Sequence, residues 1–188
     1  MIGYAFCGSF CTLSRSLSVL EALVGIGHSV LPIISERAYS TDTRFFLAEE
    51  FVRRVEEITG REAVHTVEDA EPLGPRTPLD ALIIAPCTGN TLAKIANGIT
   101  DSAVTMAAKA HLRVDRPLLI ALASNDAMSQ NLCNIGRLLT RKAVYFVPMR
   151  QDDPEGKPYS LVADMGRIPE ALAAMTEGIG RQLRPIFL

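Results

Sequence analysis

The sequence predicts an α/β fold, a three-layer, doubly wound sheet that is mostly parallel (Rossmann-like). Short apolar runs of strand length alternate along the chain with segments whose apolar residues recur at helical spacing. Glycine, proline and small polar residues separate these segments. Because 188 residues are enough to bury a sizeable core, we expect a single domain over 1–188.

The N-terminal part predicts a βαβ unit. Strands are expected over 2–7 and 30–34, with a helix between them that ends at Gly25 and Gly27. The apolar positions that indicate this helix are Leu13, Leu17, Leu20 and Val24. A strand, a helix and a second strand in this order favour parallel strands joined by a right-handed crossover.

An amphipathic helix is expected next, ending at Gly60, with a cap among the polar residues of 40–43. Its inward-facing residues are Leu47, Phe51, Val55 and Ile58. Residues 63–67 are expected to form a short edge strand that contains His65. Three prolines and a glycine make 69–78 a semi-rigid loop.

The remaining elements continue the alternation. An expected strand over 82–85 is ended by Pro86, and a helix opened by Asn90 follows, with a break at Gly98. Next we expect a helix over 104–112 and strands over 118–123 and 144–147, which are separated by a helix through Leu139. A mobile loop over 149–160 leads to a closing helix, whose apolar residues are Ile168, Leu172, Met175 and Ile179. The sum is five or six mostly parallel strands.

Charge and composition restrict the partners. The net charge is −2, from 19 basic and 21 acidic residues without a like-charge block, which argues against nucleic acid or an anionic membrane as the main partner. Apolar runs fall short of the roughly 18–20 residues that span a bilayer, and the N-terminus lacks a signal-peptide pattern. We therefore expect a cytoplasmic protein that binds a small molecule or another protein.

Four cysteines occur without a C-x-x-C motif, namely Cys7, Cys11, Cys87 and Cys133. They lie in or beside apolar segments, so we expect buried, reduced thiols rather than disulfides or a metal site.

The turn after the first strand has a single glycine, Gly8, followed by Ser9. The three-glycine fingerprint of dinucleotide-binding proteins is therefore absent, and a helix N-terminus of this kind suits one terminal phosphate. Ser35, after the second strand, is placed to reach the same phosphate, and Glu36 offers a weak signal for a ribose-binding acid. A mononucleotide fits this loop better than NAD.

Thr88, Gly89 and Asn90 form a second candidate binding turn, where an apolar strand meets a helix N-terminus. Ligands of open α/β sheets bind at the carboxyl ends of the strands. An ordinary capped strand-to-helix junction is the commoner interpretation of one such turn taken alone.

Two titratable side chains have open alternatives. Arg44 would lie at the ligand edge of the sheet, where it either clamps a carboxylate or forms a surface pair with Glu50 or Asp42. His65 is a candidate for proton transfer because histidine is a common acid-base residue, although a lone histidine in an edge strand is more often structural.

The turn at 86–91 and the helix that follows it resemble a known family. The turn is similar to the Pro-Ala-Ser-Ala-Asn-Thr signature of the FMN-binding flavoproteins that include cysteine decarboxylases; here it reads Pro86, Cys87, Thr88, Gly89, Asn90 and Thr91. The helix after that signature is matched by Lys94, Ile95, Ala96, Asn97, Gly98, Ile99 and Asp101. The Gly8-Ser9 turn resembles their flavin-phosphate loop. Within this superfamily, nearly the whole chain resembles the B subunits of dipicolinate synthases from endospore-forming bacteria.

The resemblance implies a site. A flavin phosphate would be held by Gly8, Ser9 and Ser35, and ribityl or ring atoms would face Thr88 and Asn90. The isoalloxazine edge would be approached by Ser124 and Asn125. The implied FMN-binding set is completed by Phe10, Pro86, Gly89 and Thr91. For a dianionic substrate, Arg44 is the first choice of cation, with Arg15 and Lys109 next. His65 is a loose counterpart of the family's catalytic histidine, and no metal is implied.

The resemblance also implies an activity and partners. The chain would act with an A subunit that binds NADP or NAD, and would oxidise a dihydrodipicolinate-type dicarboxylate to dipicolinate in the mother cell of a sporulating bacterium. A homo-oligomer is implied too, with the helix over 104–112 as one candidate surface. A stand-alone decarboxylase is an alternative, but the decarboxylases' Pro-x-Met-Asn-x-x-Met-Trp substrate clamp is replaced here by 124–128, and the chain has no tryptophan. A scaffolding subunit without flavin chemistry is a third interpretation.

Overall fold

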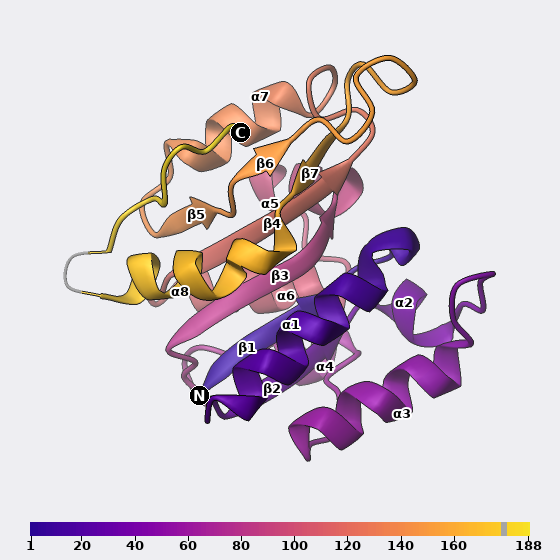
Figure 1. Cartoon of the computed structure of the whole chain (residues 1–188). Coiled ribbons are helices and arrows are strands. Elements are labelled where there is room, and N and C mark those ends of the chain that lie inside the picture. The colour runs from indigo at the N-terminus through magenta and orange to yellow at the C-terminus, as the bar shows by residue number, and fades with distance from the viewer. Residues whose placement is uncertain (178–179) are drawn as a thin grey trace.

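A seven-stranded sheet forms the centre of the computed structural model, which describes residues 1–177 and 180–188 (Figure 1). The strand order is β2-β1-β3-β4-β7-β6, and β5 also pairs with β4. The strands are β1 (Ile2–Phe6), β2 (Val30–Ile34), β3 (Ala81–Thr88), β4 (Leu118–Ser124), β5 (Val144–Phe146), β6 (Met149–Arg150) and β7 (Leu161–Ala163).

Neighbouring strands are parallel from β2 through β1, β3 and β4 to β5, which confirms the predicted doubly wound sheet. Strands β6 and β7 add an antiparallel extension, because Val162 of β7 pairs with Ala123 at the end of β4. The sheet therefore exceeds the predicted five or six strands. Both extra strands are too short to produce a periodic pattern, and β6 begins the segment that was expected to be a loop.

Helices cover both faces of the sheet. They are α1 (Leu13–Gly25), α2 (Glu36–Ser40), α3 (Ala48–Thr59), α4 (Val67–Ala70), α5 (Gly89–Asn97), α6 (Ala103–Leu112), α7 (Leu132–Leu139) and α8 (Ile168–Thr176), with 3-10 turns η1 (Phe10–Thr12) and η2 (Met165–Arg167). One apolar core lies between the sheet and α1, α3 and α8, and a second lies between the sheet and α4 to α7. Figure 1 shows α1, α3 and α8 on the near face. The predicted three layers are confirmed.

Pro86 does not end its strand as predicted. Strand β3 continues to Thr88, and its register against β4 shifts between Ile84 and Cys87. This irregularity accommodates a residue that has no N–H to donate. The carbonyl of Pro86 still accepts a hydrogen bond from the N–H of Cys7 at 3.3 Å.

The segment after β2 also differs from the prediction. The expected strand over 63–67 is reduced to one bridge between Val64 and Ile33, and the short helix α2 was not anticipated. The N-cap of α3 is Leu47 rather than a residue of 40–43, although a carboxylate oxygen of Asp42 accepts the N–H of Ala48 at 2.8 Å. At the other end of the chain, α8 ends at Thr176, and the expected helical position Ile179 lies outside the described residues.

The cysteines divide into two pairs. Cys7 and Cys87 are buried, whereas Cys11 and Cys133 are exposed, so the expectation of four buried thiols was wrong for two of them. Both exposed cysteines lie in helical turns on the side that faces away from the core.

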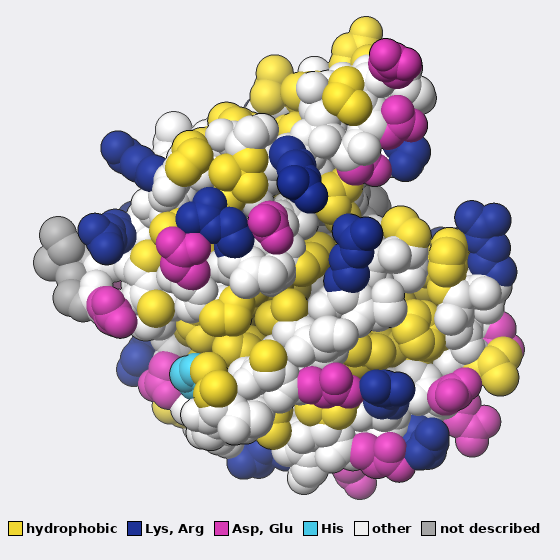
Figure 2. Space-filling model, in the orientation of Figure 1, with side chains coloured by type: hydrophobic (Ala, Val, Ile, Leu, Met, Phe, Trp, Pro, Cys, Tyr) yellow, Lys and Arg dark blue, Asp and Glu magenta, His cyan; other side chains and the backbone are white. Residues whose placement is uncertain are grey.

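The surface carries mixed charge. Figure 2 shows Lys and Arg interspersed with Asp and Glu over the face that α1, α3 and α8 form. Within 1–177 and 180–188, no helix is long and apolar enough to cross a membrane. The small residues of α6 are mostly buried within the chain itself, where they pack in the second core.

Candidate functional site

A cleft of about 510 Å³ lies where the carboxyl ends of β1, β2 and β3 meet. We call it the edge cleft; its lining residues are Gly8, Ser35, Glu36, Arg37, Thr88, Asn90, Thr91, Lys94, Asp101 and Ser102. They come from the turn after β1, from the start of α2, from α5 and from the connection between α5 and α6. The structure thus brings together five residues predicted to bind a cofactor, which are Gly8, Ser35, Thr88, Asn90 and Thr91.

Thr88 fixes the start of α5 at the edge cleft. Its hydroxyl accepts the N–H of Thr91 at 3.1 Å and donates to the hydroxyl of Thr91 at 3.0 Å. This cap satisfies one N–H of the first turn, and the remaining first-turn N–H groups have no partner within the helix. The helix dipole adds positive potential there, so α5 presents an N-terminus suited to an anion.

Ser35 and Glu36 link the edge cleft to two further helices. Ser35 caps α2 by accepting the N–H of Ala38 at 3.4 Å. One carboxylate oxygen of Glu36 accepts the N–H of Ala103 at 2.9 Å, at the start of α6. The sequence contained a weak signal that Glu36 binds a ribose. In the structure its carboxylate instead links α2 to the start of α6.

Lys94 brings a cation into the edge cleft that the sequence interpretation did not assign to binding. Its ammonium lies 2.9 Å from the carboxylate of Asp101. The hydrogen bond from Lys94 lowers the pKa of Asp101 below its usual range. The signal was available, because Asn90 and Lys94 stand four residues apart and share one helix face. Arg37 and Ser102 were missed as well, since only the folding of α2 and α6 places them here.

Ser9, Phe10 and Pro86 lie beside the edge cleft rather than in its lining. The hydroxyl of Ser9 accepts a hydrogen bond from Thr12 at 3.1 Å. The Phe10 ring packs against Gly8, where an added Cβ would stand 3.5 Å from ring atoms. Pro86 is buried within β3.

Ser124 is not free to contact a ligand, and Asn125 is exposed. The Ser124 hydroxyl donates to the carboxylate of Asp126, which also accepts from Asn131 at 3.0 Å. Both hydrogen bonds lower the pKa of Asp126, and the bond from Ser124 has the larger effect. This group packs against Gly89, where an added Cβ would lie 2.7 Å from the Asn131 amide nitrogen. The predicted cofactor residues Gly89 and Ser124 thus meet each other behind the first turn of α5.

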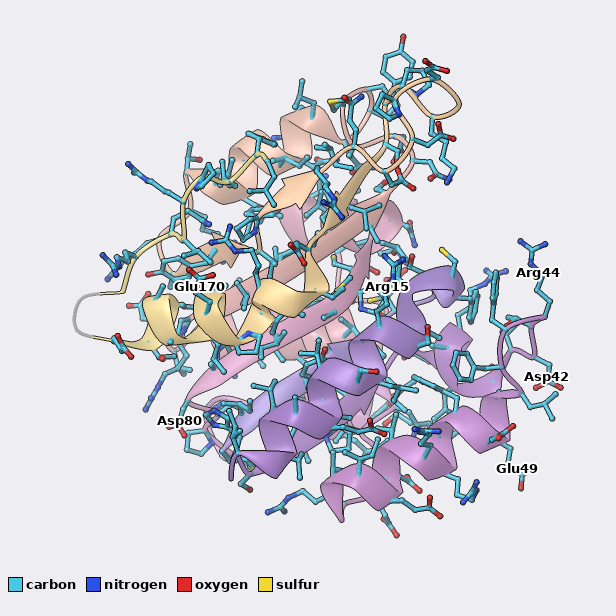
Figure 3. All side chains as sticks on the ribbon, in the orientation of Figure 1. Arg15, Asp42, Arg44, Glu49, Asp80 and Glu170 are labelled. Carbon is cyan, nitrogen blue, oxygen red and sulfur yellow. The ribbon has the colours of Figure 1, made fainter. Side chains whose placement is uncertain are left out.

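His65 and Arg44 lie away from the edge cleft lining. The His65 ring stacks on Tyr39 with centroids 3.8 Å apart, and its Nδ1 lies 3.3 Å from the carbonyl oxygen of Ala63, an arrangement that favours the structural role. The Arg44 guanidinium lies over the Phe45 ring, 4.8 Å from its centroid. Figure 3 shows Arg44 at the tip of its loop, directed away from the body of the protein.

The other two predicted cations line separate cavities. Lys109 lies on α6 beside a small cavity of about 110 Å³ between α5 and α6. Arg15, on the first turn of α1, lines a larger cleft of about 790 Å³ together with residues of β6 and β7. Of the four residues predicted to bind substrate or act on it, the structure therefore places only Arg15 in a large cleft on this edge.

Two buried thiols lie beneath the edge cleft. Burial raises the pKa of Cys7 to about 11, with a partly opposing hydrogen bond from Thr91. Burial also raises the pKa of Cys87 well above its usual value. Both groups are therefore protonated at neutral pH and serve as small core residues. Among the residues that the structure describes, no three His, Cys, Asp or Glu side chains gather as a metal site.

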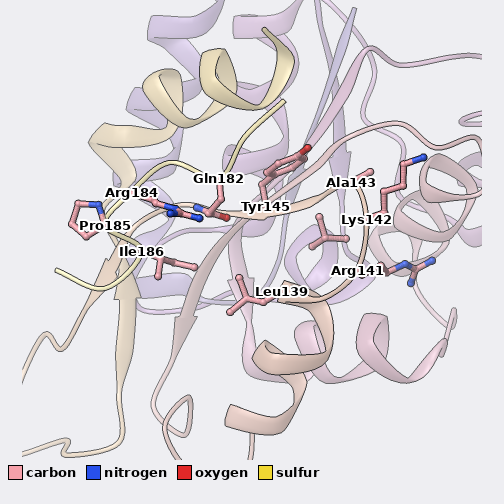
Figure 4. A pocket seen from close by; sticks show the side chains of 10 residues that line it. Leu139, Arg141, Lys142, Ala143, Tyr145, Gln182, Arg184, Pro185 and Ile186 are labelled. Atoms are coloured by element: carbon pink, nitrogen blue, oxygen red, sulfur yellow. The ribbon is translucent and has the colours of Figure 1, made fainter. Parts of the chain in front are cut away.

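A separate cavity of about 810 Å³ lies between β5 and the C-terminal segment. Gln182 holds that segment in place, because its side chain accepts the N–H of Phe146 at 2.8 Å and donates to the carbonyl of Phe146 at 2.6 Å. Figure 4 shows Arg184 directed toward Gln182, whereas Arg141 and Lys142 extend away from it. These cations do not converge on one ligand position.

Comparisons with known proteins agree with this architecture. Residues 1–177 match the family model described as Flavoprotein. The chain is 42% identical over 187 residues to the B subunit of the dipicolinate synthase of Bacillus subtilis (strain 168), covering 100% of this chain and 92% of that protein. The crystal structure of the dipicolinate synthase B subunit from Bacillus halodurans C superposes with a TM-score of 0.90 at 41% identity, covering 100% of this chain and 95% of that one.

A more distant structure supports the fold. The crystal structure of the FMN-dependent cysteine decarboxylase SpaF matches with a TM-score of 0.67 at 23% identity, over 91% of this chain and 94% of that one. The full-length matches and the family model lead to one assignment: the chain belongs to the Flavoprotein family and, within it, groups with the B subunits of dipicolinate synthases.

Proposed function

We propose that this protein is the B subunit of a dipicolinate synthase, an oxidoreductase subunit that acts with an A subunit carrying NADP or NAD. The complex would oxidise a dihydrodipicolinate-type precursor to dipicolinate in the mother cell of a sporulating bacterium. The observation that carries the proposal is the 42% identity to the Bacillus subtilis protein over 100% of this chain. The chain would form one domain over 1–188 and a homo-oligomer.

FMN is the proposed cofactor of the edge cleft. Four hydroxyls line this cleft, from Ser35, Thr88, Thr91 and Ser102, and the N-terminus of α5 opens into it. Together with the ammonium of Lys94, these groups form the donor set that a phosphate and a polyhydroxylated chain require. The volume of about 510 Å³ lies in the usual range for small-molecule sites. The residues present therefore fit a phosphorylated flavin.

The chemistry follows from the substrate. Conversion of a dihydropyridine ring to a pyridine removes a hydride and a proton, so the reaction needs an electron-pair acceptor and a proton acceptor. A bound flavin, or the nicotinamide of the A subunit, supplies the hydride acceptor. The protein's part is to bind the cofactor through the edge cleft and to hold the planar dicarboxylate with its ring toward that acceptor.

The segment 124–128 argues against the decarboxylase alternative. Ser124 and Asp126 are hydrogen-bonded to each other beneath Gly89, so these side chains are engaged with each other rather than in a substrate clamp. Release of carbon dioxide from a cysteinyl substrate by the purified chain would contradict our proposal.

Reconstitution tests the proposed function. Dipicolinate formation is measured with the A subunit alone, the B subunit alone and both together, each with and without FMN. We expect product with both subunits and FMN, and visible flavin absorption that copurifies with the present chain or appears on adding FMN. Full activity of the A subunit alone would contradict the proposal. Activity of both subunits without FMN, from a colourless preparation of this chain, would favour the scaffolding alternative.

A further inference from the structure

A second cleft at the carboxyl edge holds two arginines from separate elements. We call this cavity of about 790 Å³ the arginine cleft. Arg15 enters it from the first turn of α1, and Arg150 enters it from β6. Ser18, Gln151, Asp152 and Asp164 complete its polar lining. In Figure 3, Arg15 lies near the middle of the molecule, at the start of α1.

The guanidinium groups of both arginines are available to a ligand. Within 1–177 and 180–188, neither Arg15 nor Arg150 forms an ion pair. Both side chains are exposed to the cleft and to solvent. An unpaired arginine presents a planar fork of donors that matches a carboxylate in a bidentate arrangement.

The two carboxylates of the cleft have partners of their own. Asp152 accepts the hydroxyl of Ser160 at 2.7 Å and pairs with the ammonium of Lys157 at 3.2 Å. Its pKa is lowered, mainly by the bond from Ser160. Asp164 accepts the N–H of Gly166 at 3.2 Å, at the start of η2. The cleft lining holds two arginines and two carboxylates, and Lys157 neutralises Asp152 from outside the lining, which leaves the arginines for an incoming anion.

Rigid elements hold the arginines at this edge. Ser16, next to Arg15, donates a hydrogen bond to the carbonyl of Ala85 in β3. Arg150 pairs in register with Val162, which in turn pairs with Ala123 at the end of β4. Only the turn from Gly8 through η1 separates Arg15 from the edge cleft along the chain. The two clefts thus open on the same edge of the sheet.

We propose that the arginine cleft binds the aromatic dicarboxylate of the reaction, with Arg15 and Arg150 each receiving one carboxylate. The inference rests on the proposed function for the identity of the ligand. It retains Arg15 from the sequence prediction, adds Arg150, and replaces Arg44 and Lys109, which lie elsewhere. Because one guanidinium pairs with each end of the ligand, the site discriminates in favour of two carboxylates over one.

Calorimetric titration of the full-length protein with dipicolinate tests this assignment. Pyridine-2-carboxylate, which has a single carboxylate, is titrated in parallel. For the unaltered protein we expect dipicolinate to bind at least tenfold more tightly than the monocarboxylate. In Arg15→Gln and in Arg150→Gln, dipicolinate affinity should fall about tenfold, to the level of the monocarboxylate. Arg15→Gln/Arg150→Gln should lose measurable binding.

Matched variants make the result specific. Arg113→Gln removes an exposed arginine of the opposite sheet face and should leave dipicolinate affinity unchanged. Arg44→Gln should also leave it unchanged, whereas a loss in that variant alone would restore the sequence prediction. Thermal unfolding and FMN titration of each variant exclude misfolding. Equal dipicolinate affinity in the unaltered protein and both cleft variants would overturn the inference, as would absence of binding to the unaltered protein.

The proposed function can fail separately. If the two subunits with FMN form no dipicolinate, the function is wrong whatever the calorimetry shows. If they form dipicolinate and the apparent KM for the precursor is the same in Arg15→Gln and Arg150→Gln as in the unaltered complex, the arginine cleft is wrong and the function stands.

Discussion

Lys94 and Asp101 form an ion pair of 2.9 Å in the lining of the edge cleft, where the cation of α5 meets the connection to α6. The Lys94 side chain is 26% exposed, whereas that of Asp101 is 56% exposed. The ammonium is therefore the better shielded partner, and it reaches the edge cleft from the last turn of α5. An anionic ligand entering the cleft would compete with Asp101 for it.

Replacing Lys94 by glutamine should weaken FMN binding roughly tenfold, because a hydrogen bond to a charged group contributes about 1.5–3 kcal/mol. Quenching of flavin fluorescence during titration measures this. Asp101→Asn is the matched variant, and it should bind FMN as tightly as the unaltered protein or more tightly, since Lys94 is then released. If both variants bind FMN like the unaltered protein, Lys94 does not contact the phosphate.

Gly89→Ala should destabilise the protein by about 1–3 kcal/mol and impair FMN binding. An added Cβ would lie 2.7 Å from the amide nitrogen of Asn131 and 2.8 Å from a carboxylate oxygen of Asp126, and both atoms are fixed by hydrogen bonds. Gly136→Ala is the control, because nothing lies within 4 Å of its added Cβ in α7. There, alanine should be neutral or stabilising by up to about 1 kcal/mol. Urea unfolding of both variants checks the contrast, and equal stabilities would contradict it.

Local patterns predicted the fold well because each cue acts over a few residues. The single-glycine turn at Gly8 and the cap at Thr88 identified two parts of the edge cleft, since parallel strands bring their carboxyl ends to one edge. Asp101 and Ser102 could not be found in this way. They reach the cleft only because α5 ends at Gly98, whose left-handed conformation turns the chain back toward α2.

Ser124 shows the opposite case, in which the position was predicted and the environment was not. The residue lies at the carboxyl end of β4, as its last residue rather than in the turn after it, and its hydroxyl is taken by Asp126 two residues later. Arg150 was missed because β6 has only two residues, and its partners are β7, which follows a loop, and the C-terminal Phe187. Pairings of this kind leave no local periodicity to detect.

Alkylation should separate the cysteines. At pH 8 in native protein, we expect iodoacetamide to modify the exposed Cys11 and Cys133 and to leave Cys7 and Cys87 unmodified. With a pKa of about 11, only about one Cys7 thiol in a thousand is ionised at this pH, and burial also blocks access. Intact-mass measurement should give two adducts in the native state and four in denaturant. Rapid modification of Cys7 in the native state would contradict the buried position beneath the edge cleft.

Stability should fall as the pH drops through the window that begins at about 6.5, the unfolded pKa of histidine, and extends down to the lowered pKa of His111, and this residue should account for much of the change. This side chain is buried in α6, its Nε2 lies 2.9 Å from the carbonyl of Pro117, and its Nδ1 has no partner among the described residues. Burial lowers its pKa below the unfolded value of 6.5. Between the two values the unfolded chain binds a proton that the folded chain does not, so acid favours unfolding.

The variant His111→Gln isolates this contribution. Glutamine retains a donor for the Pro117 carbonyl and does not titrate, so the free energy of unfolding should depend less on pH in this window than in the unaltered protein. The carboxylates with lowered pKa values, Asp101, Asp126 and Asp152, lose their contribution at more acidic pH, below the window. Urea unfolding at intervals across the window measures the slope. Glutamine removes the titrating group at this position. If the free energy of unfolding of His111→Gln depended on pH as steeply as that of the unaltered protein, another group would bind the proton.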